Sequence, residues 1–293
     1  MDYSRLTVCI PAFNEEQAIK STLEELVQSF PGAEIIVVND GSEDNTEAEA
    51  RSVNGVRVLN NGRNMGYGAS LKNAIRHSSR KVIAWYDADG QHRPEDLANV
   101  VAPVLEDEKD AVIGVRGADS DKVASRVPGK KILKFVAELV AQAPVPDLNS
   151  GLRCFRKNVV VKYLHLFPEG FSASSTTTLL MMKRGYRLGY VSIRTKQRVG
   201  KSSVKMLRDG WLTLQLILRI LILFGALNFF IGCAAIQVIP ALAYGITLAV
   251  SNGQGFPVLA STFFISGLLT FFMGIICDQV TSIRKERFER NED

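Results

Sequence analysis

One long stretch without charged residues constrains the fold of this chain most. No Asp, Glu, Lys or Arg occurs between Ile220 and Cys277. About 20 apolar residues cross the hydrocarbon core of a bilayer, so this stretch is long enough for two crossings and a turn. We expect the turn at residues 251–257, where the chain is polar. The two helices are expected near residues 221–243 and 258–277, with Pro240 bending or ending the first.

Basic residues flank this expected hairpin on both sides, and its turn carries no charge. They are Lys201, Lys205, Arg208 and Arg219 before it, and Arg284, Lys285, Arg287 and Arg290 after it. The positive-inside rule places such flanks in the cytoplasm. The sequence therefore predicts a multi-pass membrane protein with two helices, whose preceding domain and both termini are cytoplasmic. The alternative is a buried helical hairpin of a soluble protein, which the length of the uncharged stretch disfavours.

The overall composition excludes several other classes of protein. The net charge of +5, from 35 basic and 30 acidic residues, is too small to indicate nucleic-acid binding and is compatible with an anionic membrane surface. The cysteines Cys9, Cys154, Cys233 and Cys277 are far apart and form no CxxC motif. They indicate reduced thiols rather than a disulfide framework or a zinc site. The first residues are too poor in apolar side chains to predict a signal peptide.

Short apolar runs alternate with helical patterns in the chain before the hairpin. Strands are expected at residues 5–10, 34–38, 56–59, 82–86, 111–115 and 190–193, and a further strand is expected after the turn-rich loop 144–153. The first helix should be capped by Asn14. This alternation predicts a parallel sheet with helices on both faces. Ligands of such sheets bind beyond the carboxyl ends of the strands, so the loops 11–15, 40–42 and 87–91 should converge on one crevice.

Two carboxylates, Asp87 and Asp89, follow the strand expected at 82–86. Alternation along an extended chain would point both to one side, and Gln91 would add a carbonyl oxygen on the same side. Hard cations such as Mg²⁺ or Mn²⁺ take oxygen ligands of this kind together with substrate phosphates. The pattern therefore predicts a metal site. A solvated turn is the alternative, because so short a motif is common.

Two other loops have the composition of anion sites. Gly66 and Gly68 open a helix and would let an anion approach its N-terminus closely, although an ordinary loop is equally compatible. Residues 194–203 combine Arg and Lys with Gly and Ser, directly before an amphipathic segment expected at 204–220. This composition predicts a phosphate site at the bilayer, with simple interfacial anchoring as the alternative.

Several motifs follow one another along this part of the chain. They are CIPAFNEE, VVNDGSEDNT, NMGYGASLKNAI, YDADGQHRPEDL, DLNSGLRCFRK, GFSASSTTTLLMMKRGYRL and RVGKSS. As an ordered set, they resemble the motifs of family 2 glycosyltransferases with the GT-A fold. The resemblance is strongest to the membrane-anchored branch that makes polyprenyl-phosphate sugars, which includes dolichol-phosphate mannose synthase and bactoprenol glucosyltransferase. It covers residues 5 to about 205.

This resemblance implies a GT-A (Rossmann-like), mainly parallel sheet in a cytoplasmic catalytic domain, residues 1–203. The amphipathic segment 204–220, the hairpin 221–277 and a basic tail, 278–293, would follow. The nucleotide would contact Pro11, Ala12, Phe13, Glu15, Asp40, Asp87 and Ala88. The metal would be held by Asp87, Asp89 and Gln91. Asp89, Arg116 and Asp147 would be catalytic, and the acceptor phosphate would face Ser150, Arg153, Arg198 and Lys201.

The activity implied by the resemblance is an inverting, metal-dependent transfer of a sugar from a UDP- or GDP-sugar to polyprenyl phosphate. A phosphate monoester has a second pKa near 6, so it is already nucleophilic at neutral pH. A general base is therefore dispensable, and Asp147 could be either a base or the cap of a turn. The QxxRW motif of processive relatives is absent at residues 196–200, which argues against polymer synthesis.

Some alternatives stay open at this point. A membrane-anchored, non-catalytic scaffold that binds nucleotide-sugars or glycans would show no effect of metal on nucleotide binding. A sugar-phosphate nucleotidyltransferase is set aside, because residues 11–15 lack its GxGxR loop. The helix after Gly170 is rich in Ser and Thr rather than acidic, so the sugar is not identified. The base, the prenyl length and a homo-oligomeric state are likewise open.

Overall fold

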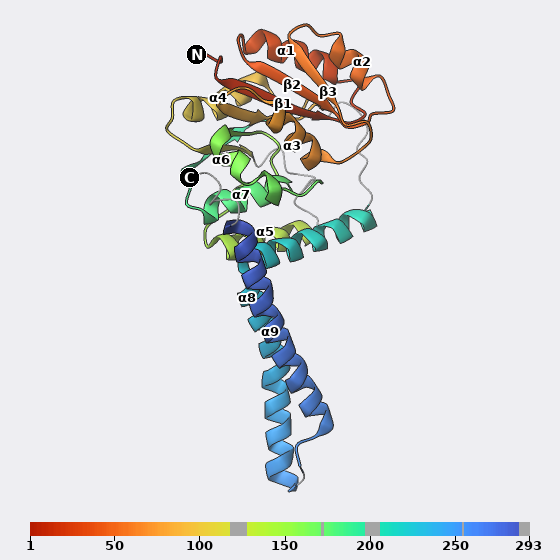
Figure 1. Ribbon diagram of the computed structural model, residues 1–293, viewed down its shortest axis with the longest axis vertical. Coiled ribbons are helices and arrows are strands. Elements are labelled where there is room, and N and C mark those ends of the chain that lie inside the picture. Colours follow the sequence, from red (N-terminus) through yellow and green to blue (C-terminus); the bar gives the residue numbers. More distant parts are fainter. Residues whose placement is uncertain (118–127, 171–172, 197–205, 254, 287–293) are drawn as a thin grey trace. The chain divides into compact units, whose positions relative to one another are not determined.

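The structure is a computed structural model that describes residues 1–117, 128–170, 173–196, 206–253 and 255–286. Two compact units share the chain, Met1–Gly210 and Trp211–Asp293 (Figure 1). The division between them falls inside the segment 204–220 that the sequence predicts to be amphipathic.

The first unit is built on a sheet whose seven described strands have the order β3-β2-β1-β4-β6-β5-β7. They are β1 (Leu6–Ala12), β2 (Glu34–Asn39), β3 (Val56–Asn60), β4 (Val82–Trp85), β5 (Ala111–Arg116), β6 (Arg153–Arg156) and β7 (Leu188–Ile193). Neighbouring strands are parallel, except that β6 is antiparallel to β4 and β5. The predicted α/β class with a mainly parallel sheet is confirmed.

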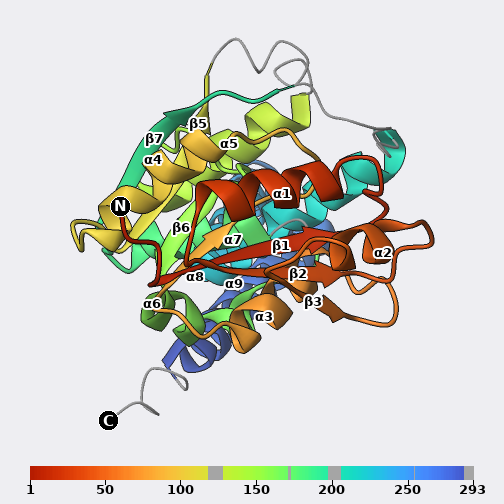
Figure 2. The ribbon, with the colours of Figure 1, turned by 90° about the horizontal axis from the view of Figure 1, so that it is seen from above.

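Helices cover both faces of this sheet. The described ones are α1 (Ile19–Ser29), α2 (Thr46–Arg51), α3 (Tyr67–His77), α4 (Pro94–Leu105), α5 (Pro128–Ala141), α6 (Lys157–Lys162) and α7 (Ala173–Lys183), with a short 3-10 helix at Leu164–Leu166. Figure 2 shows α1 and α4 on one face and α3 and α6 on the other. Helix α1 buries Ile19, Leu23 and Leu26 at helical spacing against the apolar strands, which places the main core under α1 and α4.

The expected cap at Asn14 is wrong. Helix α1 begins at Ile19, and Asn14 has a left-handed backbone with φ 54°, a conformation that Asn tolerates better than most residues. Its backbone N–H donates to the Ser42 hydroxyl at 3.0 Å, and its side-chain oxygen accepts from Glu43 N–H at 2.9 Å. Asn14 therefore joins the loop after β1 to the loop after β2 instead of starting a helix.

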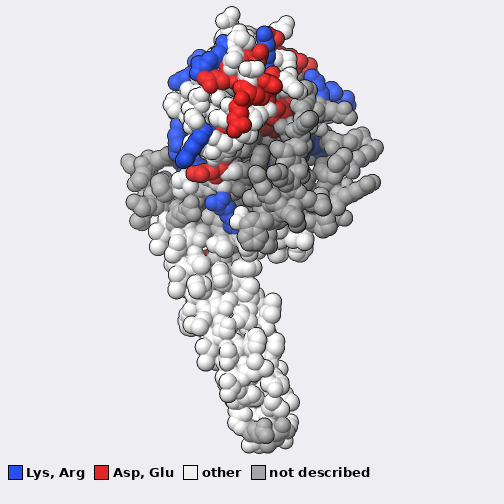
Figure 3. Space-filling view, turned by 90° about the vertical axis from the view of Figure 1, so that its right-hand side faces the viewer, with Lys and Arg blue, Asp and Glu red and all other residues white. Residues whose placement is uncertain are grey.

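The second unit is formed by two long apolar helices, α8 (Met206–Asn252), which begins at the end of the first unit, and α9 (Val258–Glu286). Their candidate membrane spans are Ile217–Ser251 and Val258–Ile283, with mean hydropathies of 2.2 and 2.0. Residues 220–277 of these helices carry no charged side chain, and on the face seen in Figure 3 most acidic and basic side chains lie on the first unit. The predicted pair of apolar helices is confirmed.

Two details of the first apolar helix differ from the prediction. Helix α8 continues through Pro240 to Asn252 rather than ending near residue 243, and its one non-helical residue is Gly225, with φ −157° and ψ 41°. Residues 241–250 are uncharged and mostly apolar, and a helix in lipid tolerates Pro because the freed backbone groups find other partners nearby. The bend in α8 falls at Gly225 rather than at Pro240.

Small and polar residues join the two helices of the hairpin. A Cβ on Gly267 or Gly274 would lie 2.4 Å from an atom of Val238 or Phe230 respectively, so the helices approach closely there. The Gln237 amide donates to the Thr270 hydroxyl at 3.2 Å and accepts from the Ser266 hydroxyl at 2.8 Å. Close contact at glycine combined with side-chain hydrogen bonds is typical of helix association in membranes.

Candidate active site

The two predicted metal carboxylates lie beyond the end of a strand rather than on it. Strand β4 ends at Trp85, Asp87 lies in the irregular stretch that follows, and Asp89 lies in a turn at residues 88–89, next to Gly90 with φ 71°. The expected strand alternation therefore does not orient Asp87 and Asp89. Ala88 is buried between them. The turn lies at the carboxyl edge of the sheet, which is where ligands of such sheets bind.

Asp87 is held from several sides. The Tyr67 hydroxyl donates to Asp87 Oδ1 at 2.9 Å, and His92 Nε2 lies 3.3 Å from Oδ2. A Cβ on Gly151 would lie only 2.0 Å from Oδ2, so the backbone of the loop before β6 approaches the carboxylate directly. Burial opposes ionisation of Asp87, but the bonds from His92 and Tyr67 outweigh it and lower its pKa. The carboxylate is therefore ionised at neutral pH.

Asp89 and Gln91 occupy the other end of the same turn. Asp89 is 9% exposed, and its Oδ1 accepts from Gln91 N–H at 3.1 Å. The backbone oxygen of Gln91 accepts from Lys196 N–H at 2.8 Å, and the side-chain amide of Gln91 donates to Lys196 O at 3.4 Å. The turn is thereby joined to the segment that follows β7. That Gln91 also binds a metal stays a prediction.

The residues predicted to contact the nucleotide lie at the ends of β1 and β2. Pro11 and Ala12 are the last residues of β1 and are buried, whereas Phe13 is 40% exposed. Glu15 N–H donates to the Thr46 hydroxyl at 2.8 Å. Asp40 is 3% exposed and follows β2. The structure therefore brings these residues to one edge of the sheet, next to each other along neighbouring strands.

Asp40 has a structural partner that the sequence did not reveal. Its Oδ1 accepts from the Asn61 amide at 2.7 Å and from Met65 N–H at 3.0 Å, while its Oδ2 accepts from Gly66 N–H at 2.8 Å. Gly41 lies against the same loop, since a Cβ there would be 2.5 Å from Arg63. Asp40 therefore shapes the loop between β3 and α3. Its contact with a nucleotide stays a prediction.

The glycines at the start of α3 do not open a space for an anion. A Cβ on Gly66 would lie 2.6 Å from Glu169 O, and one on Gly68 would lie 2.0 Å from Pro168 O. Ala69 N–H donates to Glu169 O at 3.0 Å. The close approach expected at Gly66 and Gly68 is thus made by the chain itself. A carbonyl oxygen occupies this helix N-terminus, which corrects the anion-site interpretation.

Arg116 and Asp147 form a bidentate ion pair. Arg116 Nε lies 2.8 Å from Asp147 Oδ2 and Nη2 lies 3.0 Å from Oδ1. Asp147 is 9% exposed and also accepts from Asn149 N–H, so the predicted turn cap is present. Burial opposes ionisation, but the bonds and charge of Arg116 lower the pKa of Asp147. A carboxylate with a lowered pKa is a weak general base.

Arg153 is buried instead of facing an acceptor. It is 0% exposed, and burial lowers its pKa to about 10. Its guanidinium donates to Ser150 O at 2.6 Å, Leu148 O at 2.9 Å and Ser174 O at 2.7 Å, and also to the Thr178 hydroxyl. The prediction that Arg153 binds the acceptor phosphate is therefore corrected. Arg153 ties the loop before β6 to α7.

Ser150 differs from its neighbour Arg153. Its hydroxyl is buried and has no hydrogen-bond partner among the described residues. A buried hydroxyl without a partner costs free energy, so this atom is available to a ligand or a water molecule. The other two predicted acceptor residues, Arg198 and Lys201, lie outside the described residues.

Sequence reasoning missed three residues around Asp87, namely Tyr67, His92 and Gly151. His92 lies in the same motif as Asp87, and its position five residues later was the one available signal. Tyr67 and Gly151 are distant in sequence, and nothing in their spacing indicates the contact. No cluster of three or more His, Cys, Asp or Glu side chains suited to a metal occurs in the described part of the chain. A cation at Asp87 and Asp89 would need oxygens from its substrate as well.

The order and direction of the strands place the first unit in the GT-A fold class. A solved structure of glucosyl-3-phosphoglycerate synthase from Mycobacterium tuberculosis, in complex with Mn²⁺, UDP and glucosyl-3-phosphoglycerate, has the same fold. The two structures superpose with a TM-score of 0.60 and share 20% sequence identity, and the match covers 74% of this chain and 78% of that one. The family model for glycosyl transferase family 2 matches residues 7–164, and this chain belongs to that family.

Two relatives come from the lipid-linked branch of the family. The UDP-N-acetylglucosamine–dolichyl-phosphate N-acetylglucosaminyltransferase of Methanococcus voltae is 30% identical, over 64% of this chain and 83% of the relative. The undecaprenyl-phosphate mannosyltransferase of Micrococcus luteus is 25% identical, over 68% of this chain and 87% of the relative. Family membership makes this protein an enzyme, so the non-catalytic scaffold is set aside.

Proposed function

We propose that this glycosyltransferase transfers a sugar, with inversion, from a UDP- or GDP-sugar to a polyprenyl phosphate at the cytoplasmic face of a membrane. The observation that carries the proposal is the bonding of Gln91 to Lys196. It joins the acidic turn that would receive the donor to the start of the basic segment that leads to the apolar helices. The names of the two relatives support a polyprenyl-phosphate acceptor.

The residues of the acidic turn fit a divalent cation. Asp87 is kept ionised by hydrogen bonds from Tyr67 and His92, and Asp89 follows it by two residues. Asp87 and Asp89, with Gln91, would hold Mg²⁺ or Mn²⁺ against the donor diphosphate. When bound, such an ion acts as a Lewis acid that offsets the charge of the departing diphosphate. Pro11, Ala12, Phe13, Glu15, Asp40 and Ala88 would hold the nucleotide.

The acceptor side needs positive charge rather than a base. A phosphate monoester is nucleophilic without deprotonation at neutral pH, and the lowered pKa of Asp147 makes that residue a poor base. Asp147 instead forms a bidentate ion pair with the guanidinium of Arg116. Arg116 is 33% exposed and can face a phosphate or sugar. We assign acceptor binding to Arg116, Ser150, Arg198 and Lys201. Arg198 follows Lys196 by two residues in the sequence.

Transfer of label into lipid tests this function. Membranes that contain the enzyme are incubated with polyprenyl phosphate, Mn²⁺ and each of a panel of labelled UDP- and GDP-sugars. We expect one donor to give label that partitions into organic solvent and depends on the added lipid. The matched control is Asp89→Asn. The proposal would be refuted if the wild-type enzyme transferred label only to water-soluble products or polymer, and if that transfer did not depend on the added lipid.

The proposed orientation is tested separately. Reporter enzymes fused after residue 293 and inserted at residue 254 should be active on opposite sides of the membrane, with the C-terminal one cytoplasmic. Activity of the C-terminal reporter outside the cytoplasm would contradict this orientation.

A further inference from the structure

The carboxylate of Asp87 is restrained by three segments that are far apart in sequence. Tyr67 comes from the N-terminus of α3, His92 from the loop before α4, and Gly151 from the loop before β6. Each carboxylate oxygen has its own donor, Tyr67 at 2.9 Å and His92 at 3.3 Å. A carboxylate restrained in this way has few orientations open to it.

The imidazole of His92 is itself held in place. The side chain is 5% exposed, and its ring meets the Tyr86 ring edge to face, with centroids 5.5 Å apart. The Tyr86 hydroxyl donates to His92 O at 2.8 Å, which fixes the backbone as well. Nδ1 is buried and has no hydrogen-bond partner among the described residues. The one polar contact of this buried ring in the described part of the chain is therefore the contact with Asp87.

Tyr67 is also held in place by its surroundings. It is the first residue of α3, and the start of that helix is pressed against residues 168–170 through Gly66 and Gly68. Burial and the charge of Asp87 raise the pKa of Tyr67 well above its ordinary value, so the hydroxyl keeps its proton and donates. The helix start could not accept a larger residue at Gly68, so the tyrosine has little freedom to move away from Asp87.

We propose that Tyr67 and His92 are positioning residues, which fix the carboxylate of Asp87 in one orientation before the metal and the donor nucleotide bind. This inference rests on the proposed function, because it assumes that Asp87 faces the cation. Residues that orient a ligand carboxylate typically change metal affinity 10- to 100-fold when they are removed. Preorganised groups of this kind act because little reorientation remains at the moment of binding.

Two substitutions of His92 separate orientation from packing. His92→Phe keeps an aromatic ring against Tyr86 but has no donor for Asp87. His92→Gln loses the ring but keeps an N–H donor at a similar reach. Tyr67→Phe removes one hydroxyl and leaves the ring. The matched control is Tyr163→Phe, which removes a hydroxyl that hydrogen-bonds Tyr186 at 3.1 Å elsewhere in the first unit.

The measurement is binding rather than turnover. Full-length protein in detergent is titrated with UDP and with GDP by calorimetry, with and without Mn²⁺, and Mn²⁺ alone is followed by electron paramagnetic resonance. In the presence of Mn²⁺, we expect Tyr67→Phe and His92→Phe each to weaken binding of the preferred nucleotide about tenfold. We expect little change without metal. His92→Gln should stay within about threefold of wild type, and Tyr163→Phe should match it.

The outcomes distinguish this inference from the function on which it rests. A larger loss in His92→Gln than in His92→Phe would show that the ring acts through packing, which would overturn the positioning role. Equal binding by wild type, Tyr67→Phe and His92→Phe would overturn it as well, with the proposed function intact. A wild-type protein whose nucleotide binding ignores Mn²⁺ would overturn the metal role itself, and the positioning role with it.

Discussion

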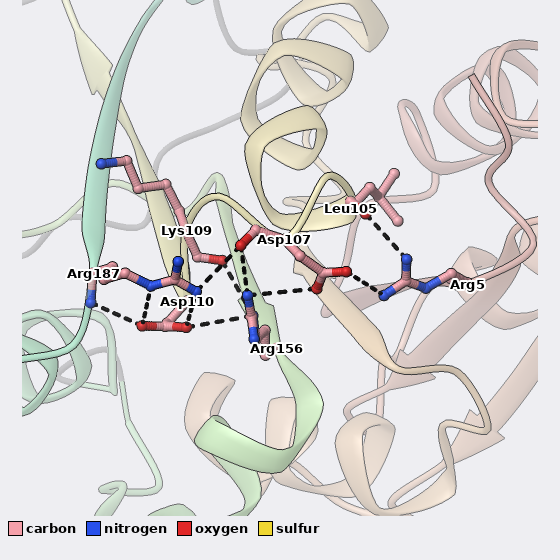
Figure 4. Close-up of polar contacts among 7 residues, drawn as sticks. All are labelled: Arg5, Leu105, Asp107, Lys109, Asp110, Arg156 and Arg187. Carbon is pink, nitrogen blue, oxygen red and sulfur yellow. Dashed lines mark hydrogen bonds and ion pairs between the residues drawn. The ribbon is translucent and has the colours of Figure 1, made fainter.

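In the first unit, the acidic residues at the carboxyl edge of the sheet and those at its opposite, amino edge have different kinds of partner. At the carboxyl edge, Asp40 and Asp87 accept from a hydroxyl, an imidazole, an amide and backbone N–H groups. At the other edge, Asp107 and Asp110 lie among arginines (Figure 4). Asp110 pairs with Arg187 at 3.0 Å and with Arg156 at 3.4 Å, and Asp107 pairs with Arg5 at 3.3 Å.

The difference lies in the kind of partner that holds each carboxylate. The hydrogen bonds of Arg187 outweigh burial and lower the pKa of Asp110, and this acid forms ion pairs with two arginines. Asp87 is also kept ionised, but the groups that bond to it are a histidine and a tyrosine, with the charge of Arg116 nearby. Acids at one edge are therefore held in ion pairs with arginine, whereas Asp40 and Asp87 are held mainly by hydrogen-bond donors.

The largest effect is expected at the carboxyl edge. Asp89→Asn keeps the shape of the side chain but removes a charge facing the proposed cation. Turnover should fall at least about 100-fold, on the scale of losing a key electrostatic group. The melting temperature should hardly change. Sugar transfer to lipid and a thermal melt check both parts. Near-normal activity that EDTA also leaves intact would remove the metal from the mechanism.

A smaller loss is expected from Asp147→Asn, which also decides the role of that residue. If Asp147 orients Arg116, as the bonds of 2.8 and 3.0 Å indicate, turnover should fall about tenfold and the KM for polyprenyl phosphate should rise. Donor affinity should be unaffected. A loss beyond about 1000-fold with an unchanged acceptor KM would instead identify a general base.

At the opposite edge, we expect a change in stability without a change in activity. Asp110→Asn weakens bonds to Arg187 and Arg156 and should cost about 1 kcal/mol. The melting temperature should then fall by about 3 °C. Sugar transfer at 25 °C is the control. Lost activity with an unchanged melting temperature would break the contrast between the two edges.

The same variant predicts a dependence on pH. The pKa of Asp110 is lower in the folded state than in the unfolded chain, where it is about 3.9. Its contribution is therefore complete above that value and is lost as the pH falls through the folded pKa. The difference in melting temperature between wild type and Asp110→Asn should be constant from pH 7 to 5 and should narrow below about pH 4.

The smallest effect is expected for Arg5→Ala. Arg5 and Asp107 are 42% and 56% exposed, and solvent screens an exposed pair. About 0.5 kcal/mol, or a shift of 1–2 °C, is expected in a thermal melt. A shift in melting temperature as large as that of Asp110→Asn would mean that Arg5, Arg156 and Arg187 act as one network with the two acids.

The sequence was informative wherever a local pattern determines the structure. Apolar runs located most strands, and the acidic residues behind β2 and β4 do lie at the carboxyl edge. It was uninformative about partners, because contacts such as Tyr67 with Asp87 join segments with no shared pattern. Arg153 shows this limit most clearly. The family resemblance implied that this cation faces the acceptor, whereas it is surrounded by carbonyl oxygens of the loop just before it and of α7.

Strand β6 was the least predictable part of the sheet. It is four residues long, carries an arginine at each end and runs against its neighbours. A strand was expected after the loop that ends at Arg153, but nothing in the short run RCFR indicates that it is antiparallel to its neighbours. Its position between β4 and β5, where it pairs with both, depends on segments distant in sequence.

That strand also determines the order in which the enzyme can assemble as it is synthesised. The strands β1 to β4 pair among themselves, so this half of the sheet can form while the chain is still growing. The other edge of β4 pairs with β6, where Trp85 lies opposite Arg153. Gly151 reaches Asp87 only through this pairing. A nascent chain that stops before β6 therefore carries the acidic turn without its full surroundings.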